Sequence, residues 1–507
     1  MRRIGWTVAC VVLVAGLVLP MTASAQAPEE YQKRRQAVRD AMEPDSVLVV
    51  RNTPITDDSG LPRLDPNFLY LTGVMDPGAA LVLYASKRTT PEGLPPGIRL
   101  RFPTEMLFKP MPSAVPRAGR SGQATAGTPD ALPSAPGFAP GTVRRAADFQ
   151  AAFDSLLLAM SQTLYLDYRR SRVLNGPMTE DEQLLKQARD RGAALKIKPV
   201  STVVAKLRVI KSPEEIRLLR QAAEITAAAE REAMRAAKPG LFEYQLQSII
   251  EHVFTINGAR RPGFTTIVGS GPNSCILHWS ENTRQTQAGD LVVLDIGAEY
   301  QGYSGDITRT IPTSGTFTKR QRDIYEIVLR ANEQAIEMLK PGVSMRDVSA
   351  KVQDVLGEGL IRLGVIKDKA ETPRYSLHGP THPIGLQVHD VGSTAVLEPG
   401  MVVTIEPGLY FPGESLGIRI EDDVLVTASG HEVITGSAPK SIEAIEALMK
   451  QGGGIDFRRY LVPKIGTDQA PGSRLLASGS CCACLTRCRR EPVRSGSRPS
   501  AKPGRKP

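Results

Sequence analysis

No apolar run long enough to span a bilayer follows residue 19 of this 507-residue chain, which excludes a polytopic membrane protein. Hydrophobic residues make up 41% of the chain and charged residues 23%, which are ordinary values for a globular protein. This composition excludes a collagen-like chain and a chain that is disordered throughout. At about 150 residues per domain, the length predicts two to four domains.

Cysteine is rare, and four of the six cysteines stand close together near the C-terminus. They are Cys481, Cys482, Cys484 and Cys488. Because no second ligand pair follows at the spacing of a zinc site, we expect no zinc knuckle here. Cys275 is the one cysteine in the middle of the chain, and we expect a small buried residue there rather than a nucleophile.

The net charge of +10 is concentrated at the two ends of the chain. Residues 464–507 hold ten Lys and Arg against two acidic residues, and two arginines at positions 2 and 3 supply the rest of the excess. Residues 4–463 are therefore neutral, which removes the charge argument for a nucleic-acid partner. Since the C-terminal segment is also rich in Gly, Pro and Ser, we expect 451–507 to form a disordered basic tail.

The first 25 residues have the layout of a secretory signal peptide. Two arginines precede the twelve-residue apolar run Val8–Leu19, and the small-residue pattern Ala23-Ser24-Ala25 follows. The alternative is an uncleaved N-terminal anchor, but the apolar run is short for a span. We therefore predict a signal peptide at 1–25 and an exported protein, periplasmic or secreted, with no membrane span after cleavage.

Residues 26–204 are expected to form a smaller α/β domain. Apolar periodicity and turn residues predict six elements here. They are helices at Glu29–Met42, Ala147–Met160 and Thr179–Arg191 and strands at Ser46–Arg51, Ala80–Tyr84 and Thr163–Asp167. Eleven prolines stand between Pro91 and Pro140 among many Gly, Ser and Ala, which predicts an extended loop.

Residues 205–450 are expected to form one α+β domain of about 240 residues. Ser212-Pro213-Glu214-Glu215 is a capping box with proline at the first helical position, and Thr318 and Ser344 open two further helices. Apolar strands are predicted between the helices. They lie at Leu291–Ile296, Tyr303–Ile311, Met401–Ile405 and Gly417–Thr427.

Histidine is as rare as cysteine, yet three of the six histidines fall within twelve residues. They are His378, His382 and His389, in the run His-Gly-Pro-Thr-His-Pro-Ile-Gly-Leu-Gln-Val-His-Asp. A lone histidine is usually an ordinary polar residue. Three of them among small residues, where glycine lets a ligand approach the backbone, indicate a binding or catalytic segment instead.

Four acidic residues stand on strands that otherwise suit a core. Asp295 and Asp306 are eleven residues apart, which suits two strands joined at Tyr300–Gly302 and brings the two carboxylates together. Glu406 ends one apolar strand and Glu421 lies within another. Each carboxylate alone could be a solvated strand end, but four of them beside a histidine cluster point to a metal site.

Burying four carboxylates without cations would be costly. Carboxylates shared between two cations, with one imidazole, make an oxygen-rich site that favours Mn²⁺ over a sulfur-bound structural zinc. Two such ions hold a hydroxide between them and polarise a carbonyl, which is hydrolytic chemistry. The expected cofactor is therefore two divalent metal ions, with Mn²⁺ preferred.

Five of these residues, in their order and local contexts, resemble the ligand set of the pita-bread metallopeptidases, which include methionine aminopeptidases, prolidases and aminopeptidase P. They are Asp295, Asp306, His382, Glu406 and Glu421. The resemblance covers about 205–449 and implies a pita-bread catalytic domain. The run Asp65–Gly73 also resembles the N-terminal domain of aminopeptidase P and prolidase, which favours the proline-directed branch.

The resemblance implies a role for each ligand. Asp295 would hold one ion, while Asp306 and Glu421 would bridge both ions. His382 and Glu406 would complete the second ion, and Glu406 would also act as general base or proton shuttle for the bridging water.

The resemblance also assigns residues that face the substrate. His278 and His389 match histidines that bind substrate and stabilise the transition state, and an imidazole N–H suits a developing oxyanion. His378 matches a further histidine near the proline subsite. Arg419 would orient Glu421.

The expected activity is that of an Xaa-Pro aminopeptidase, which removes the residue before a proline in second position of a peptide substrate. One alternative is a prolidase, which cleaves only Xaa-Pro dipeptides, and another is a non-catalytic relative that uses the fold for binding. Assembly as a homo-oligomer is expected from the resemblance. His252 and His431 match nothing in the family, and we expect them at the surface.

Overall fold

A computed structural model of the chain describes residues 26–56, 61–87, 104–110, 134–159, 163–167, 178–190, 195–392 and 396–453. The predicted signal peptide and the tail beyond residue 453, with its four cysteines, lie outside the described residues. The described ranges all belong to one compact unit, which ends at Ile455. None of the helices in these ranges has both the length and the apolar character needed to cross a bilayer.

The first part of the chain forms a six-stranded mixed sheet in the order β6-β5-β4-β1-β7-β8. The strands are β1 (Val47–Arg51), β4 (Ala80–Tyr84), β5 (Glu105–Lys109), β6 (Val143–Arg145), β7 (Thr163–Leu166) and β8 (Lys196–Lys198). A short hairpin, β2 (Ile55–Thr56) and β3 (Pro62–Arg63), stands apart from this sheet. The helices are α1 (Pro28–Ala41), α2 (Pro66–Thr72), α3 (Phe149–Ala159) and α4 (Glu180–Asp190), with a 3-10 turn η1 (Ala146–Asp148) before α3. The six elements predicted in this region are thus present, each within two residues at either end.

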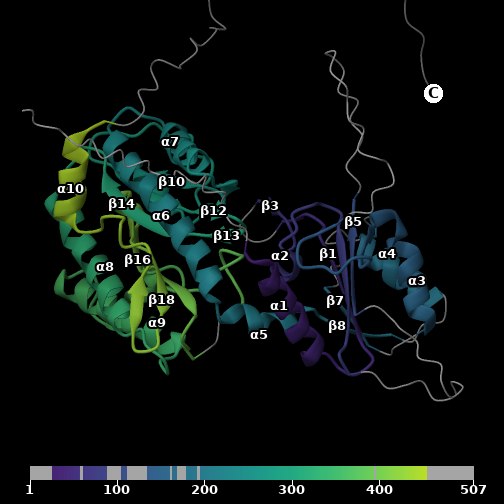
Figure 1. Cartoon of the computed structure of the whole chain (residues 1–507). Helices are drawn as coiled ribbons and strands as arrows, with labels where there is room; N and C mark the ends of the chain where they lie inside the picture. The colour runs from purple at the N-terminus through teal and green to yellow at the C-terminus, as the bar shows by residue number, and fades with distance from the viewer. Residues whose placement is uncertain are drawn as a thin grey trace, which may run out of the picture. The chain divides into compact units, whose positions relative to one another are not determined.

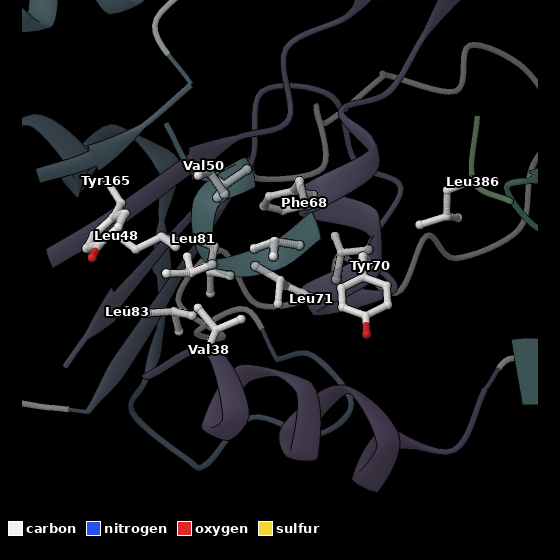
Figure 2. Close-up of a cluster of buried hydrophobic side chains, with 14 of the residues drawn as sticks. Val38, Leu48, Val50, Phe68, Tyr70, Leu71, Leu81, Leu83, Tyr165 and Leu386 are labelled. Atoms are coloured by element: carbon white, nitrogen blue, oxygen red, sulfur yellow. The ribbon is translucent and has the colours of Figure 1, made fainter. Parts of the chain in front are cut away.

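The central strand β1 is buried on both faces because its side chains alternate between two apolar clusters. Leu48 and Val50 join the cluster that α1 and α2 cover, where Phe68 is fully buried. Figure 2 shows these side chains gathered between the helices and the sheet. Val47 and Val49 point to the other cluster, which contains residues of α3 and α4. The sheet is therefore the middle layer of three, as the labels in Figure 1 show.

The proline-rich stretch contains an ordered strand that the sequence did not predict. Leu107 at the centre of β5 pairs with Leu81 of β4 and is completely buried, and Phe108 beside it is 1% exposed. Three consecutive apolar residues are enough for a strand when neighbours on both sides supply its hydrogen bonds. The expectation of a loop across Pro91–Pro140 is therefore wrong for Glu105–Lys109, and 91–103 and 111–133 lie outside the described residues.

The second part of the chain packs helices around several small antiparallel sheets (Figure 1). Its helices are α5 (Ser201–Val209), α6 (Pro213–Ala236), α7 (Glu243–Ile256), α8 (Lys319–Glu337), α9 (Met345–Arg362) and α10 (Ile442–Gln451), with 3-10 turns η2 (Gly271–Cys275), η3 (Lys369–Arg374) and η4 (Pro412–Glu414). The predicted caps are confirmed, because the side chains of Ser212, Thr318 and Ser344 accept N–H bonds from the first turns of α6, α8 and α9. Helices α6 and α7 pack together, as do α8 and α9.

Four sheets lie among these helices, in the orders β10-β11-β14, β13-β12-β9, β15-β18-β19 and β16-β17. Their strands are β9 (Arg261–Pro262), β10 (Ile267–Ser270), β11 (Leu291–Ile296), β12 (Ala298–Tyr300), β13 (Tyr303–Ser304), β14 (Ile307–Pro312), β15 (Val402–Ile405), β16 (Gly408–Phe411), β17 (Leu416–Arg419), β18 (Asp422–Val426) and β19 (His431–Val433). The expected turn after Tyr300 is confirmed, because Gln301 and Gly302 take positive φ angles of 50° and 89° between β12 and β13.

Two predicted strands are interrupted, and both interruptions fall at a carboxylate. The strand expected at Tyr303–Ile311 breaks between β13 and β14 at Gly305, where a Cβ would lie 2.8 Å from the Thr226 hydroxyl of α6. The strand expected at Gly417–Thr427 breaks between β17 and β18, just at Glu421. These breaks release the neighbouring side chains from the strict in–out alternation of a strand.

Candidate metal centre

All eight residues predicted for the site line one cavity of about 490 Å³ in the second part of the chain. They are Asp295, Asp306, Glu406, Glu421, His278, His378, His382 and His389. Since they come from segments up to 143 residues apart, the sequence motifs meet only because the sheets and loops fold them onto a common point. Their roles at this point stay predictions.

The four carboxylates come from strands or strand ends. Asp295 is in β11, opposite Thr308 of β14, and Asp306 immediately precedes β14. Glu406 follows the last residue of β15, and Glu421 lies between β17 and β18. The Thr308 hydroxyl donates to a Glu421 carboxylate oxygen at 2.6 Å, and the Glu421 N–H donates to the Thr308 carbonyl at 3.0 Å.

His382 completes a compact donor set with two of these acids. One ligand atom from each of Asp306, His382 and Glu421 can be chosen so that all three lie within 4.8 Å of one another. His382 Nε2 is 3.6 Å from Asp306 Oδ2, 3.5 Å from Glu406 Oε1 and 3.8 Å from Glu421 Oε1. The other ring nitrogen, Nδ1, lies 3.1 Å from the Pro383 carbonyl, which directs Nε2 toward the carboxylates. Burial and the neighbouring His389 lower the pKa of His382, which favours the neutral form that binds metals.

The electrostatics of the cavity call for cations. Burial, and then the adjacent carboxylates, raise the pKa values of Asp306 and Glu421 well above their ordinary range. Within the described residues, Asp295 Oδ1 and Asp306 Oδ1 are buried without any hydrogen-bond partner. Oxygen atoms in this condition suit divalent ions, so the donor set fits the metals that the sequence predicts.

Arg419 contacts two of the carboxylates, Asp295 directly and Glu421 through Thr308. Its Nη2 donates to Asp295 Oδ2 at 2.6 Å, whereas Glu421 takes its hydrogen bond from the Thr308 hydroxyl. Arg419 Nε donates to that same Thr308 hydroxyl at 3.2 Å, so the predicted link between Arg419 and Glu421 runs through Thr308. The direct bond uses Asp295 Oδ2, and Asp295 Oδ1 has no hydrogen-bond partner within the described residues.

Tyr410 of β16 joins the site without any signal in the sequence. Its hydroxyl accepts from Arg419 Nη1 at 2.8 Å and lies 2.8 Å from His378 Nε2. These bonds are complementary when the tyrosine donates to Nε2 and His378 carries its proton on Nδ1, which is 3.3 Å from Glu406 Oε2. Burial raises the pKa of Tyr410 to about 12, so its hydroxyl keeps its proton. A tyrosine in an apolar strand reads as a core residue, which is why the sequence did not mark it.

The remaining histidines divide between the cavity and the rest of the chain. His278 is exposed and follows η2, and its ring makes no hydrogen bond within the described part of the chain. The ring of His389 lies against His382, with 4.5 Å between the ring centroids. His252 is exposed as expected, whereas His431 is half-buried with Nδ1 3.1 Å from the Leu339 carbonyl.

Cys275 is half-buried rather than buried, and burial raises the pKa of its thiol, which disfavours a nucleophile.

Comparison with known proteins places these residues in a family. The family model of metallopeptidase family M24 matches residues 217–428, which contain all eight cavity residues named above. The chain is 38% identical to the Xaa-Pro aminopeptidase of Escherichia coli strain K12 over 457 residues, which covers 83% of this chain and 97% of that protein. It is also 33% identical to the Homo sapiens Xaa-Pro dipeptidase, over 48% of this chain and 61% of that protein.

A solved structure of zinc-substituted Escherichia coli aminopeptidase P in complex with product matches with a TM-score of 0.71 and 36% identity. The match covers 84% of this chain and 99% of that chain, so it includes both the six-stranded sheet and the cavity-bearing part. The predicted class, an α+β pita-bread domain preceded by a smaller α/β domain, is thereby confirmed.

Proposed function

Since the chain belongs to metallopeptidase family M24, we propose that it is a dimetal Xaa-Pro aminopeptidase, which hydrolyses the bond between an N-terminal residue and a following proline. The observation that carries the proposal is the cavity in which three buried carboxylates and the half-buried Glu406 face His382 and three further histidines. The match to Xaa-Pro aminopeptidases spans nearly their whole length, whereas the match to the dipeptidase spans about three fifths of it. The aminopeptidase is therefore favoured over the prolidase.

Five residues would hold the metals: Asp295, Asp306, His382, Glu406 and Glu421. When bound, two divalent ions supply the Lewis acidity that activates a water and polarises the scissile carbonyl. Manganese is our proposal for the ion, because the donors are four carboxylates and one imidazole. Metal analysis of the protein purified without added metal tests this choice.

Glu406 is placed to move the proton in this reaction. Burial raises the pKa of the Glu406 carboxyl, but the hydrogen bond and the charge interaction with the His378 imidazole lower it by more. The pKa of Glu406 therefore lies below its ordinary value. An ionised Glu406 can accept a proton from the attacking water and pass it to the leaving proline nitrogen. His278 and His389 reach the same cavity, where an imidazole N–H can donate to the carbonyl oxygen as negative charge develops on it.

The test combines peptide length with metal removal. The purified full chain is assayed for release of the first residue from Xaa-Pro-Xaa tripeptides and from Xaa-Pro dipeptides, with and without a chelator. We expect tripeptide cleavage that the chelator abolishes and Mn²⁺ restores. Cleavage of the dipeptide alone would make the protein a prolidase, and metal binding without hydrolysis of either peptide would make it a non-catalytic relative.

Two further proposals rest on the sequence pattern and the family resemblance. We propose that the protein is exported after removal of residues 1–25, which N-terminal sequencing of protein from cell fractions would test. We also propose that it assembles as a homo-oligomer with no nucleic-acid partner. Light scattering on the purified protein would measure the assembly directly.

A further inference from the structure

Glu243, the first residue of α7, is fully buried and receives an unusual number of hydrogen bonds. Its Oε1 accepts from the Ser270 N–H at 2.7 Å, the Ser270 hydroxyl at 2.6 Å and the Asn273 amide at 3.0 Å. Its Oε2 accepts from the Trp279 indole N–H at 2.9 Å and the Arg284 N–H at 2.9 Å. One carboxylate thus binds five donors across residues 270–284.

The residue type follows from this bonding pattern. A carboxylate accepts on both oxygens, whereas a glutamine would turn an NH₂ group toward donors that already point at it. The N-terminus of α7 adds a partial positive charge that favours an anion at this position. The side chain of Arg284 is not the counter-ion, because its guanidinium pairs with Asp290 at 2.6 Å. Glu243 is therefore an anion held mainly by neutral N–H and O–H groups.

The segment that Glu243 holds carries His278, an exposed histidine of the cavity. Trp279, whose indole bonds Glu243, is the next residue along the chain. On the other side of His278, the Leu277 carbonyl accepts from Arg419 Nη2 at 3.3 Å. The ring of His278 has no hydrogen bond of its own within the described residues, so its position depends on these two flanking anchors.

We propose that Glu243 is a positioning residue, which fixes His278 in the wall of the cavity by binding Trp279 and the start of the same segment. The proposal rests on the substrate-facing role given to His278 above. Glu243 lies in α7 and does not line the cavity, so the proposal adds a residue outside the cavity to those that the reaction needs. Residues that orient groups of a metal site typically contribute roughly 10- to 100-fold to activity.

The experiment is a double-mutant cycle between Glu243→Gln and His278→Ala in the full chain. We expect Glu243→Gln to lower kcat/KM on an Xaa-Pro-Xaa peptide roughly 10- to 100-fold, with metal content unchanged. In the His278→Ala background the same substitution should cost less than about twofold, because there is no imidazole left to position. Equal losses in the two backgrounds, or no loss in either, would overturn the proposal.

Trp279→Phe is the milder variant, to be used also if Glu243→Gln does not fold. It removes one of the five donors to Glu243, the indole N–H, and part of the ring, and should lower kcat/KM roughly two- to tenfold, again only while His278 is present. Glu446→Gln is the matched control, since Glu446 also accepts a backbone N–H and a side-chain bond but lies outside the cavity. Its kcat/KM should equal that of the wild type.

A spectroscopic measurement separates this proposal from the proposed function. Trp6, one of the two tryptophans, lies in the segment 1–25 that we propose is removed, so Trp279 is the only tryptophan of the processed protein, and Trp6→Phe gives the same result in the unprocessed chain. Quenching of its fluorescence by acrylamide should increase when Glu243→Gln frees the indole. If the wild type cleaves no Xaa-Pro peptide, the proposed function fails, yet increased quenching would still support the anchor and unchanged quenching would refute it.

Discussion

The acids and the histidines of the cavity are held in different ways. The four carboxylates lie in or beside strands, and backbone ladders such as β11–β14 and β15–β18 fix their spacing. The histidines lie on irregular segments, 275–280 and 376–392, of which residues 380–384 bond to the backbone at the strand β15. Buried charged side chains hold both segments as well: Glu243 holds the first, and Asp390 holds the second through Arg208 and Lys211.

This difference separates the metal-binding part of the site from the substrate-facing part. A ladder is a local, cooperative arrangement that tolerates most changes in side chains away from it. A segment held by one buried carboxylate depends on that carboxylate, because breaking the pair leaves an uncompensated buried group. Variants on the strand side should therefore lose metal binding, and variants of the buried anchors should lose the position of the segment that they hold.

The largest effect is expected from a carboxylate on the strand side. Asp306→Ala should lower kcat/KM at least about 1,000-fold and abolish metal binding, because metal-ion catalysis supplies several kcal/mol. The fold should survive, since the ladder at β14 does not use this side chain. Metal content, kcat/KM and thermal unfolding with and without Mn²⁺ check this prediction.

The metal-free forms sharpen the same test. In the wild type Asp306 is buried among like charges, so removing it should leave the metal-free protein at least as stable as the wild type. Added Mn²⁺ should then raise the unfolding temperature of the wild type but not that of the variant. Full peptidase activity in Asp306→Ala would overturn the site assignment.

The second effect concerns the anchor of the histidine run. Asp390, directly after His389, forms a buried ion pair with Arg208 of α5, and its N–H donates to the Pro383 carbonyl at 2.9 Å. Asp390→Asn keeps the shape but leaves Arg208 and Lys211 without their counter-charge, which should cost about 3–5 kcal/mol of stability. Activity should fall roughly 10- to 100-fold.

Metal content distinguishes this anchor from Glu243. The segment held by Asp390 carries His382 as well as His389, so Asp390→Asn should weaken Mn²⁺ binding, whereas Glu243→Gln should not. Adding Arg208→Gln to Asp390→Asn should restore part of the lost stability, since it removes an unpaired buried cation. Unchanged metal affinity in Asp390→Asn would break the distinction between the two segments.

The same contrast explains how much of the site could be predicted from the sequence. Asp295 and Asp306 stood out because a hairpin with a turn after Tyr300 is a local pattern, and the structure contains that turn. Glu243 did not stand out, because an acid in the first turn of a helix is ordinary and only the tertiary structure shows that it is buried. Tyr410 was missed for the same reason.

The fold shows the same limit at β5. The apolar strands β1, β4, β7, β11 and β15 were predicted within two residues, whereas β5 stands among prolines and could be identified only by its partners β4 and β6. The local sequence pattern thus predicted the elements whose conformation is determined by their own residues. Elements and side chains whose structure depends on partners distant in the sequence could be identified only from the three-dimensional structure.

A third, smaller effect should come from Tyr410, which connects the acids of the cavity to its histidines by bonding to both Arg419 and His378. Tyr410→Phe removes the hydroxyl between Arg419 and His378 while keeping the ring in β16. We expect a roughly tenfold lower kcat/KM and about 1–3 kcal/mol lower stability, because a buried Arg419 N–H loses its acceptor. Metal content should not change. Activity equal to the wild type would show that His378 needs no partner for its position.

The smallest effect is expected from an exposed ion pair beside the site. Glu414, in η4 between β16 and β17, pairs with Arg320 of α8 at 2.7 Å, and both side chains are about 40% exposed. The hydrogen bond from Arg320 lowers the pKa of Glu414 below its ordinary 4.5, against a smaller opposing effect of burial. Because solvent screens this pair, Glu414→Gln should cost at most about 0.5 kcal/mol at pH 7.

The sign of its pH dependence follows from the lowered pKa. The contribution of Glu414 is complete above its unfolded pKa of 4.5 and is lost as the pH falls through the lower folded value. Urea unfolding of wild type and Glu414→Gln should therefore differ at pH 7 and converge once the pH has fallen below the lowered folded value. The kcat/KM values should be equal, because β16 and β17 pair with each other without this contact. A large loss of activity would mean that exposed contacts also position the site, and the division between ladders and buried anchors would then be too simple.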